Sequence, residues 1–145
     1  MNLIQKVEYW GDTHHPKWLD ILRISLGIII FVKGVVFIAD TNSVIRLLQD
    51  TKFQPNAWAI IHYVAFAHLV GGIFIAFGLL TRIFVAFQIP ILIGAVFFVN
   101  LTNGLSYLNS ELWVSIFVFL LLILFLIVGS GPYSTDDLIK RRRSF

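Results

Sequence analysis

Residues 112–128 read LWVSIFVFLLLILFLIV, an uninterrupted run without a charged residue. A helix needs roughly 17 to 25 such residues to cross the hydrocarbon core of a bilayer. Strands of a membrane β-barrel would instead alternate polar and apolar residues over about ten positions. The segment 120–126, LLLILFL, has no such alternation. The run therefore predicts a membrane-spanning helix and argues against a barrel.

Three further apolar runs precede this one, at residues 24–39, 57–80 and 83–99. The first reaches spanning length only when Trp18 to Arg23 are included. We expect an all-α integral membrane four-helix bundle that forms a single membrane domain over residues 1–145. Its predicted spans lie near 18–39, 57–80, 83–100 and 111–130, with a tail at 131–145.

Shorter amphipathic helices are expected outside these spans. Residues 3–10 and 44–50 place apolar side chains at helical spacing, which is typical of helices that lie at the membrane interface. Ser134 followed by Asp137 resembles a capping box, and it predicts a short basic helix in the tail.

The composition of the whole chain agrees with a membrane protein. Of its 145 residues, 58% are hydrophobic and only 13% are charged, whereas soluble domains have about 25% charged residues. The absence of cysteine excludes disulfides, thiolate nucleophiles, iron–sulfur clusters and cysteine-based zinc sites on this chain. The net charge is +3, and the cations lie beside the apolar runs. Their position is explained by the orientation of the chain in the membrane, so it does not predict nucleic-acid binding.

The cations also predict which way the bundle faces. If the spans alternate in direction, Arg46 and Lys52 lie on one side and most of the other cations lie opposite. Cytoplasmic segments carry an excess of lysine and arginine, so both termini are expected in the cytoplasm. The cations on that predicted side are Lys6, Lys17, Arg23, Arg82, Lys140, Arg141, Arg142 and Arg143.

Small residues indicate which helices pack together, because helix contacts in lipid favour side chains that let backbones approach. The fourth span has almost no small residue between Val114 and Val128. We therefore expect the first three helices to pack closely and the fourth to present much of its surface to lipid or to a partner's membrane helix. The candidate packing residues are Gly27, Gly34, Gly71, Gly72, Gly78 and Gly94.

Three polar residues inside the spans are candidates for a binding pocket, and each has a structural alternative. Lys33 either faces a cavity or extends its stem to the outer headgroups. His68 either hydrogen-bonds across helices or offers a titrating, ligand-binding imidazole. Glu111 either interacts favourably with the positive end of the dipole of the fourth helix or acts as counter-charge to Lys33.

With His62, these side chains would form a tentative binding pocket of Lys33, His62, His68 and Glu111 in the outer half of the bundle. His62 and His68 are six positions apart, about 120° around a helix, so they cannot hold one metal ion from the same face. No phosphate loop, dinucleotide fingerprint or hydrolase motif occurs, and no catalytic or metal-binding residues are expected.

The order of these features resembles the DoxX family of small four-helix membrane proteins. The matching segments are LRISLG at 22–27, HLVGG at 68–72, GLLTR at 78–82 and GSGPYSTD at 129–136. The chain departs from the family at His68, where an acidic residue is common. The resemblance implies a small integral subunit that works beside other subunits, with a connection to quinones and membrane redox complexes.

Two hypotheses follow for the function. The first is a DoxX-like, multi-pass protein of the bacterial cytoplasmic (inner) membrane that acts as a non-catalytic accessory or anchoring subunit of a larger complex. The basic tail at 140–143 would then bind anionic lipid or an acidic partner. The alternative is a redox-linked subunit whose outer pocket binds a quinone headgroup or a small anion, with quinone as the candidate cofactor.

Overall fold

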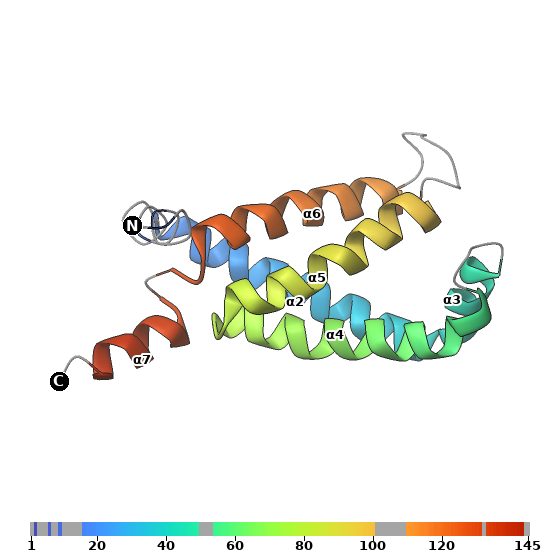
Figure 1. The fold of residues 1–145 in the computed structure, drawn as a ribbon, viewed down its shortest axis with the longest axis horizontal. Helices are drawn as coiled ribbons and strands as arrows, with labels where there is room; N and C mark the ends of the chain where they lie inside the picture. Colours follow the sequence, from blue (N-terminus) through green and yellow to red (C-terminus); the bar gives the residue numbers. More distant parts are fainter. Residues whose placement is uncertain are drawn as a thin grey trace.

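The computed structural model describes residues 2, 6, 9, 16–49, 54–100, 110–131 and 133–143, and all regular structure in these ranges is helical. Four long helices lie side by side along one axis (Figure 1). They are α2 (Trp18–Ala39), α4 (Ala57–Phe77), α5 (Thr81–Gly94) and α6 (Ser110–Val128). The predicted fold class, an all-α membrane bundle, is confirmed.

Helices α2, α4 and α6 are long and apolar enough to cross a membrane, and a shorter apolar helix covers Thr81–Phe97. This shorter helix is α5 with the start of a π-helical continuation, η2 (Ala95–Asn100). Helix α4 ends at Phe77, three residues before the predicted end of the second span. It ends there because Gly78 has a φ of 70° and Leu80 a φ of 49°, left-handed conformations that terminate a helix.

The long helices pack in chain order: α2 against α4, α4 against α5, and α5 against α6. Helices α2 and α6 have few direct contacts. Between the helices lies an apolar core that includes Leu26, Ile75, Val85, Leu122 and Phe125.

The fourth long helix, α6, packs mainly against α5 and presents much of its surface outward, as expected from its scarcity of small residues. Helices α6 and α2 each bury 28% of their membrane window inside the bundle. Large side chains of α6, among them Leu122 and Phe125, form its part of the apolar core. Dispersion contacts between well-packed apolar side chains also hold helices together in lipid.

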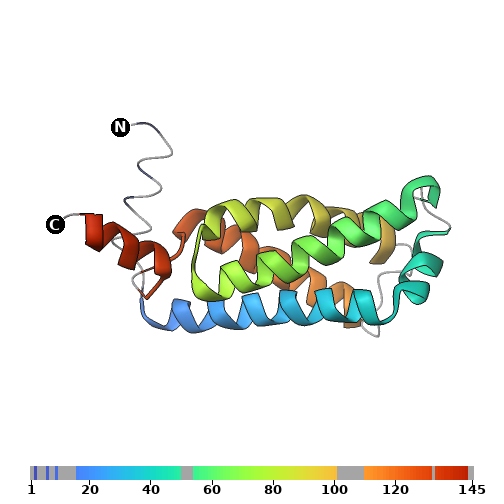
Figure 2. The same cartoon turned by 90° about the horizontal axis from the view of Figure 1, so that it is seen from below.

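Short helices lie at the two ends of the bundle. Helix α3 (Thr41–Leu48) and the 3-10 turn η1 (Gln54–Asn56) connect α2 to α4 at one end. The side chain of Asp40 caps α3 by accepting a hydrogen bond from the Ser43 N–H at 3.2 Å. Helix α7 (Thr135–Arg143) extends beyond the opposite end, as Figures 1 and 2 show. Of the helix predicted at 3–10, only Lys6 and Tyr9 lie in the described part of the chain, and both are helical.

Candidate functional site

Two of the four residues predicted to form an outer pocket make a cross-helix ion pair. The Nζ of Lys33 on α2 donates to Oε2 of Glu111 on α6 at 2.6 Å. The lysine side chain is 35% exposed and the glutamate side chain 64% exposed, so the pair lies at the edge of the bundle. Lys33 is six residues, or about 9 Å, from the end of α2 at Ala39. The pair therefore links the first and last long helices near the α3 end.

His68 lies inside the bundle and packs on α2 at Gly34, the residue after Lys33. Only 6% of the residue is exposed, and its ring meets the Phe37 ring edge-on at 5.5 Å between centroids. The Nδ1 of His68 is 2.8 Å from the backbone oxygen of Val64, so Nδ1 carries the proton that it donates. In the neutral ring, Nε2 is then a hydrogen-bond acceptor.

His62 lies outside this group. Its side chain is exposed, its Nδ1 contacts the backbone oxygen of Trp58 at 2.8 Å, and its ring stacks on Trp58 at 4.0 Å between centroids. The structure thus pairs Lys33 with Glu111, packs His68 against the residue after Lys33, and places His62 against its own helix. No group of three or more potential metal ligands occurs among the described residues.

The glycines of α2 and α4 lie where these two helices touch. A Cβ on Gly27 would be 2.5 Å from the backbone nitrogen of Ala76, and a Cβ on Gly72 would be 2.6 Å from that of Phe31. At Gly34 the corresponding Cβ would be 3.0 Å from the Cβ of His68. These contacts explain why α2 and α4 form the most extensive helix pair.

The remaining candidate glycines have different surroundings. A Cβ on Gly71 would be 2.6 Å from Nε2 of Gln88, which crosses from α5 to donate to the Ala67 carbonyl at 2.6 Å. Gly71 therefore leaves room for a side chain that joins α5 to α4. Around Gly94, by contrast, an added Cβ meets no described atom within 4 Å.

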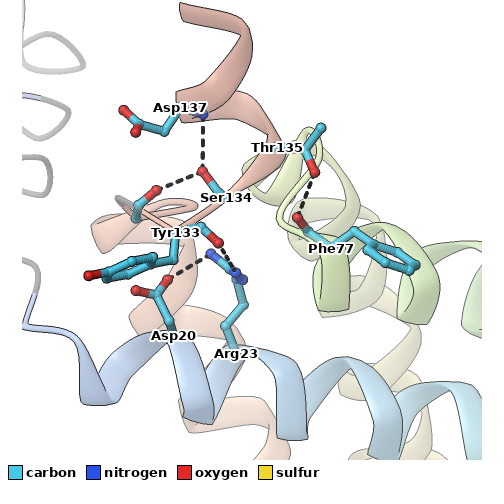
Figure 3. Close-up of polar contacts among 8 residues, drawn as sticks. Asp20, Arg23, Phe77, Tyr133, Ser134, Thr135 and Asp137 are labelled. Carbon is cyan, nitrogen blue, oxygen red and sulfur yellow. Dashed lines mark hydrogen bonds and ion pairs between the residues drawn. The ribbon is translucent and has the colours of Figure 1, made fainter. Parts of the chain in front are cut away.

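A second polar cluster lies at the Trp18 end of the bundle, and its burial was not predicted from the sequence (Figure 3). Arg23 is only 1% exposed and Asp20 5%. One guanidinium nitrogen of Arg23 donates to the Asp20 carboxylate at 3.0 Å, and another donates to the Tyr133 carbonyl at 3.1 Å. Gly78 packs directly on this guanidinium, since a Cβ there would be 2.9 Å from the Cζ of Arg23.

The same cluster fixes the base of α7. Thr135 Oγ1 donates to the Phe77 carbonyl at 3.0 Å, and the Asp136 N–H donates to the Gly78 carbonyl at 3.2 Å. The Asp136 carboxylate in turn accepts from the Leu80 N–H at 3.1 Å. Three hydrogen bonds therefore hold the first turn of α7 against the turn between α4 and α5.

The predicted cap of α7 is confirmed. Ser134, 1% exposed, accepts a hydrogen bond from the Asp137 N–H at 3.1 Å and donates its own proton to the Gly131 carbonyl at 2.6 Å. Figure 3 shows both bonds at the start of the helix.

Two of the cations from which the orientation in the membrane was predicted also form hydrogen bonds within the bundle. Arg23 belongs to the buried cluster, and Arg82 donates to the Ile127 carbonyl at 3.1 Å beside Gly129. The signal available in the sequence was the i,i+3 spacing of Asp20 and Arg23. This spacing predicts an ion pair but not its burial, which depends on residues more than 100 positions away.

These features define the class of protein: a small multi-pass membrane protein whose helices are joined by an ion pair and by hydrogen bonds from side chains to backbone carbonyls. The model of the DoxX family matches residues 18–101, and the chain belongs to this family. The match extends from α2 through η2 and leaves α6 and α7 outside it. No curated protein and no solved structure gives a significant match to the chain.

Proposed function

We propose that this chain is a non-catalytic accessory or anchoring subunit of a larger complex in the bacterial cytoplasmic membrane. In this proposal the whole chain is one membrane domain, and both of its termini face the cytoplasm. The observation that carries the proposal is the way in which α7 is held.

Helix α7 is attached at its base and projects from the bundle beyond its first turn. Its first turn makes three hydrogen bonds to the turn between α4 and α5. From there it runs away from the bundle in both views (Figures 1 and 2). Leu138 is 62% exposed and Ile139 41% exposed, and the helix ends in the four cations at 140–143. A fixed, projecting helix with apolar and basic residues is suited to docking a partner.

The polar side chains within the spans support a structural rather than a catalytic role. Arg23, Lys33 and Gln88 each bond to another helix or to the segment before α7. Groups committed to such links contribute to the assembly of the bundle, and disrupting them for chemistry would weaken it.

The orientation is tested first, because a cytoplasmic partner requires a cytoplasmic α7. The chain has no cysteine, so Arg142→Cys on α7 and Asn42→Cys on α3 each provide a single thiol at an exposed position. A membrane-impermeant maleimide applied to intact spheroplasts should label Cys at position 42 and leave position 142 unlabelled until the cells are lysed. The reverse pattern contradicts the proposed orientation.

Complex membership is tested by purification of the full-length chain from native membranes in mild detergent, followed by mass spectrometry of co-purifying proteins. We expect a stoichiometric companion whose recovery falls about tenfold when Leu138→Ser and Ile139→Ser are combined. Arg46→Gln on α3, an exposed change at the other end, is the matched control and should retain the companion. Recovery of a lone chain from native membranes would count against an accessory role.

A second function, in a redox-linked subunit, is supported by the arrangement of Lys33, Glu111 and His68. A buried imidazole beside an ion pair is suited to a polar headgroup in a dry site. Since Nδ1 of His68 donates to Val64, the neutral ring offers an acceptor, which matches the hydroxyl of a quinol better than the carbonyl of a quinone.

This second function is tested by titrating short-chain quinol and quinone into the purified protein. Binding through the pocket predicts that quinol binds more tightly than quinone and that His68→Ala and Lys33→Met each weaken quinol binding about tenfold. His62→Ala, which alters the histidine outside the group, is the control. Equal binding by all variants excludes this pocket.

A further inference from the structure

An open apolar hollow lies between α2 and α4, on the outer surface of the bundle, with a volume of about 410 Å³. Its floor is formed by Gly27 and Gly72, where the two backbones are in contact. Its walls include Ile28 and Phe77, which are 53% and 69% exposed. The two helices run side by side in Figure 2. The hollow is therefore rigid at its base and open to the surrounding lipid.

The position of the hollow along α2 fits one leaflet of the bilayer. It begins at Ile24, about 9 Å from Trp18, and ends at Phe31, close to the middle of the helix. Each leaflet contributes about 15 Å of hydrocarbon, so the lower half of an acyl chain from the leaflet next to Trp18 lies at this depth.

A cation lies on the same face of α2 at headgroup level. Lys17 is 7, 11 and 14 positions before Ile24, Ile28 and Phe31, a spacing that places all four residues on one side of the helix. The side chain of Lys17 is exposed, with its Nζ 6.0 Å from the centre of the Tyr133 ring. Trp18 beside it is 57% exposed, as expected for an aromatic residue at the membrane interface.

From these observations we propose that the hollow is a binding site for one anionic phospholipid of the leaflet next to Trp18. One acyl chain fills the space between α2 and α4, and the phosphate group lies against Lys17. The glycine contact fixes the shape of the hollow, and the lysine selects negative charge. This site is separate from the outer pocket and from α7, so it stands independently of the proposed function.

The site is tested by native mass spectrometry of the full chain released from nanodiscs that contain equal amounts of phosphatidylglycerol and phosphatidylcholine with identical acyl chains. The wild-type chain should retain one phosphatidylglycerol in preference to phosphatidylcholine. Lys17→Gln should lower this preference about fivefold, as expected for one cation at the membrane surface. Arg46→Gln removes an exposed cation of α3, at the other end of the bundle, and should leave the preference unchanged.

The acyl-chain contact is tested separately with Ile73→Trp, which fills the hollow from an exposed wall position. This variant should lose both lipids, whereas Phe66→Trp, exposed on α4 but outside the hollow, should retain them. Equal retention of the two lipids by the wild-type chain overturns the proposal. So does a stable dimer that Ile73→Trp disrupts, because the hollow would then hold a helix of a second copy.

Discussion

Arg23 is the most buried charged residue in the described part of the chain, and it joins segments that are 110 positions apart. Its guanidinium bonds Asp20 within α2 and the Tyr133 carbonyl before α7 at the same time. A planar group with several fixed donors can make both bonds, whereas a lysine ammonium is a single point of charge. The residue therefore connects the start of α2 to the base of α7.

We predict that Arg23→Met lowers the free energy of unfolding by about 3 kcal/mol, because it leaves the buried Asp20 carboxylate without its cation. Adding Asp20→Asn should restore part of this loss, since the second change removes the unpaired charge. Unfolding in mild detergent by titration with sodium dodecyl sulfate, followed by tryptophan fluorescence, measures both effects. Arg46→Met at an exposed position is the control, with an expected change within about 0.5 kcal/mol. If the double variant loses as much free energy of unfolding as the two single variants together, Arg23 and Asp20 do not stabilise each other.

At the scale of elements, the contact between α2 and α4 depends on glycines that face backbone atoms. We predict that Gly27→Ala lowers the free energy of unfolding by about 1 to 3 kcal/mol, because its Cβ would be 2.5 Å from the Ala76 backbone and the helices must separate. Gly94→Ala is the matched control: its Cβ meets no described atom, and alanine favours a helix by up to about 1 kcal/mol over glycine. The same detergent unfolding assay compares them. Equal effects at the two positions would refute the close contact.

The helices themselves could be predicted from the sequence because apolar length alone decides which segments can cross lipid. The start of α2 at Trp18 and the cap of α7 at Ser134 could also be predicted, because each depends on residues close to it in the sequence. The sequence was a weaker guide to which helices pack against each other. Counting small residues indicated the α2–α4 contact through Gly27 and Gly72, but it could not indicate that α6 packs on α5, because α6 contributes large side chains to the core.

The candidate site was predictable to a similar extent. Lys33 and Glu111 form the ion pair that the sequence offered as one of two alternatives, because a charge inside a span needs a partner at its own depth. His62 faces its own Trp58. The buried Arg23 cluster could not be foreseen, because its carbonyl partner at Tyr133 is set by how the chain turns after α6.

At the scale of the whole molecule, polar links close the ring of four helices. Helices α2 and α6 have few direct contacts, yet they are joined near one end by Lys33 and Glu111. Near the other end, Arg23 of α2 bonds Tyr133, just after α6. The apolar core fills the space between these two links. The first link should therefore hold the start of α6 in place rather than stabilise the whole bundle.

We predict that Glu111→Gln increases hydrogen exchange in the first turn of α6 while the second half of that helix, which contains Leu122 and Phe125, remains protected. Because both side chains of the pair are partly exposed, the loss in global stability should be no more than about 1 kcal/mol. The exchanged pair Lys33→Glu with Glu111→Lys restores opposite charges and should recover the protection, whereas Lys33→Glu alone places two carboxylates together and should reduce it further. Hydrogen exchange with mass spectrometry in nanodiscs measures each variant. If the exchanged pair behaves like Lys33→Glu alone, charge complementarity does not hold α6 against α2, and the ring is closed by its apolar core.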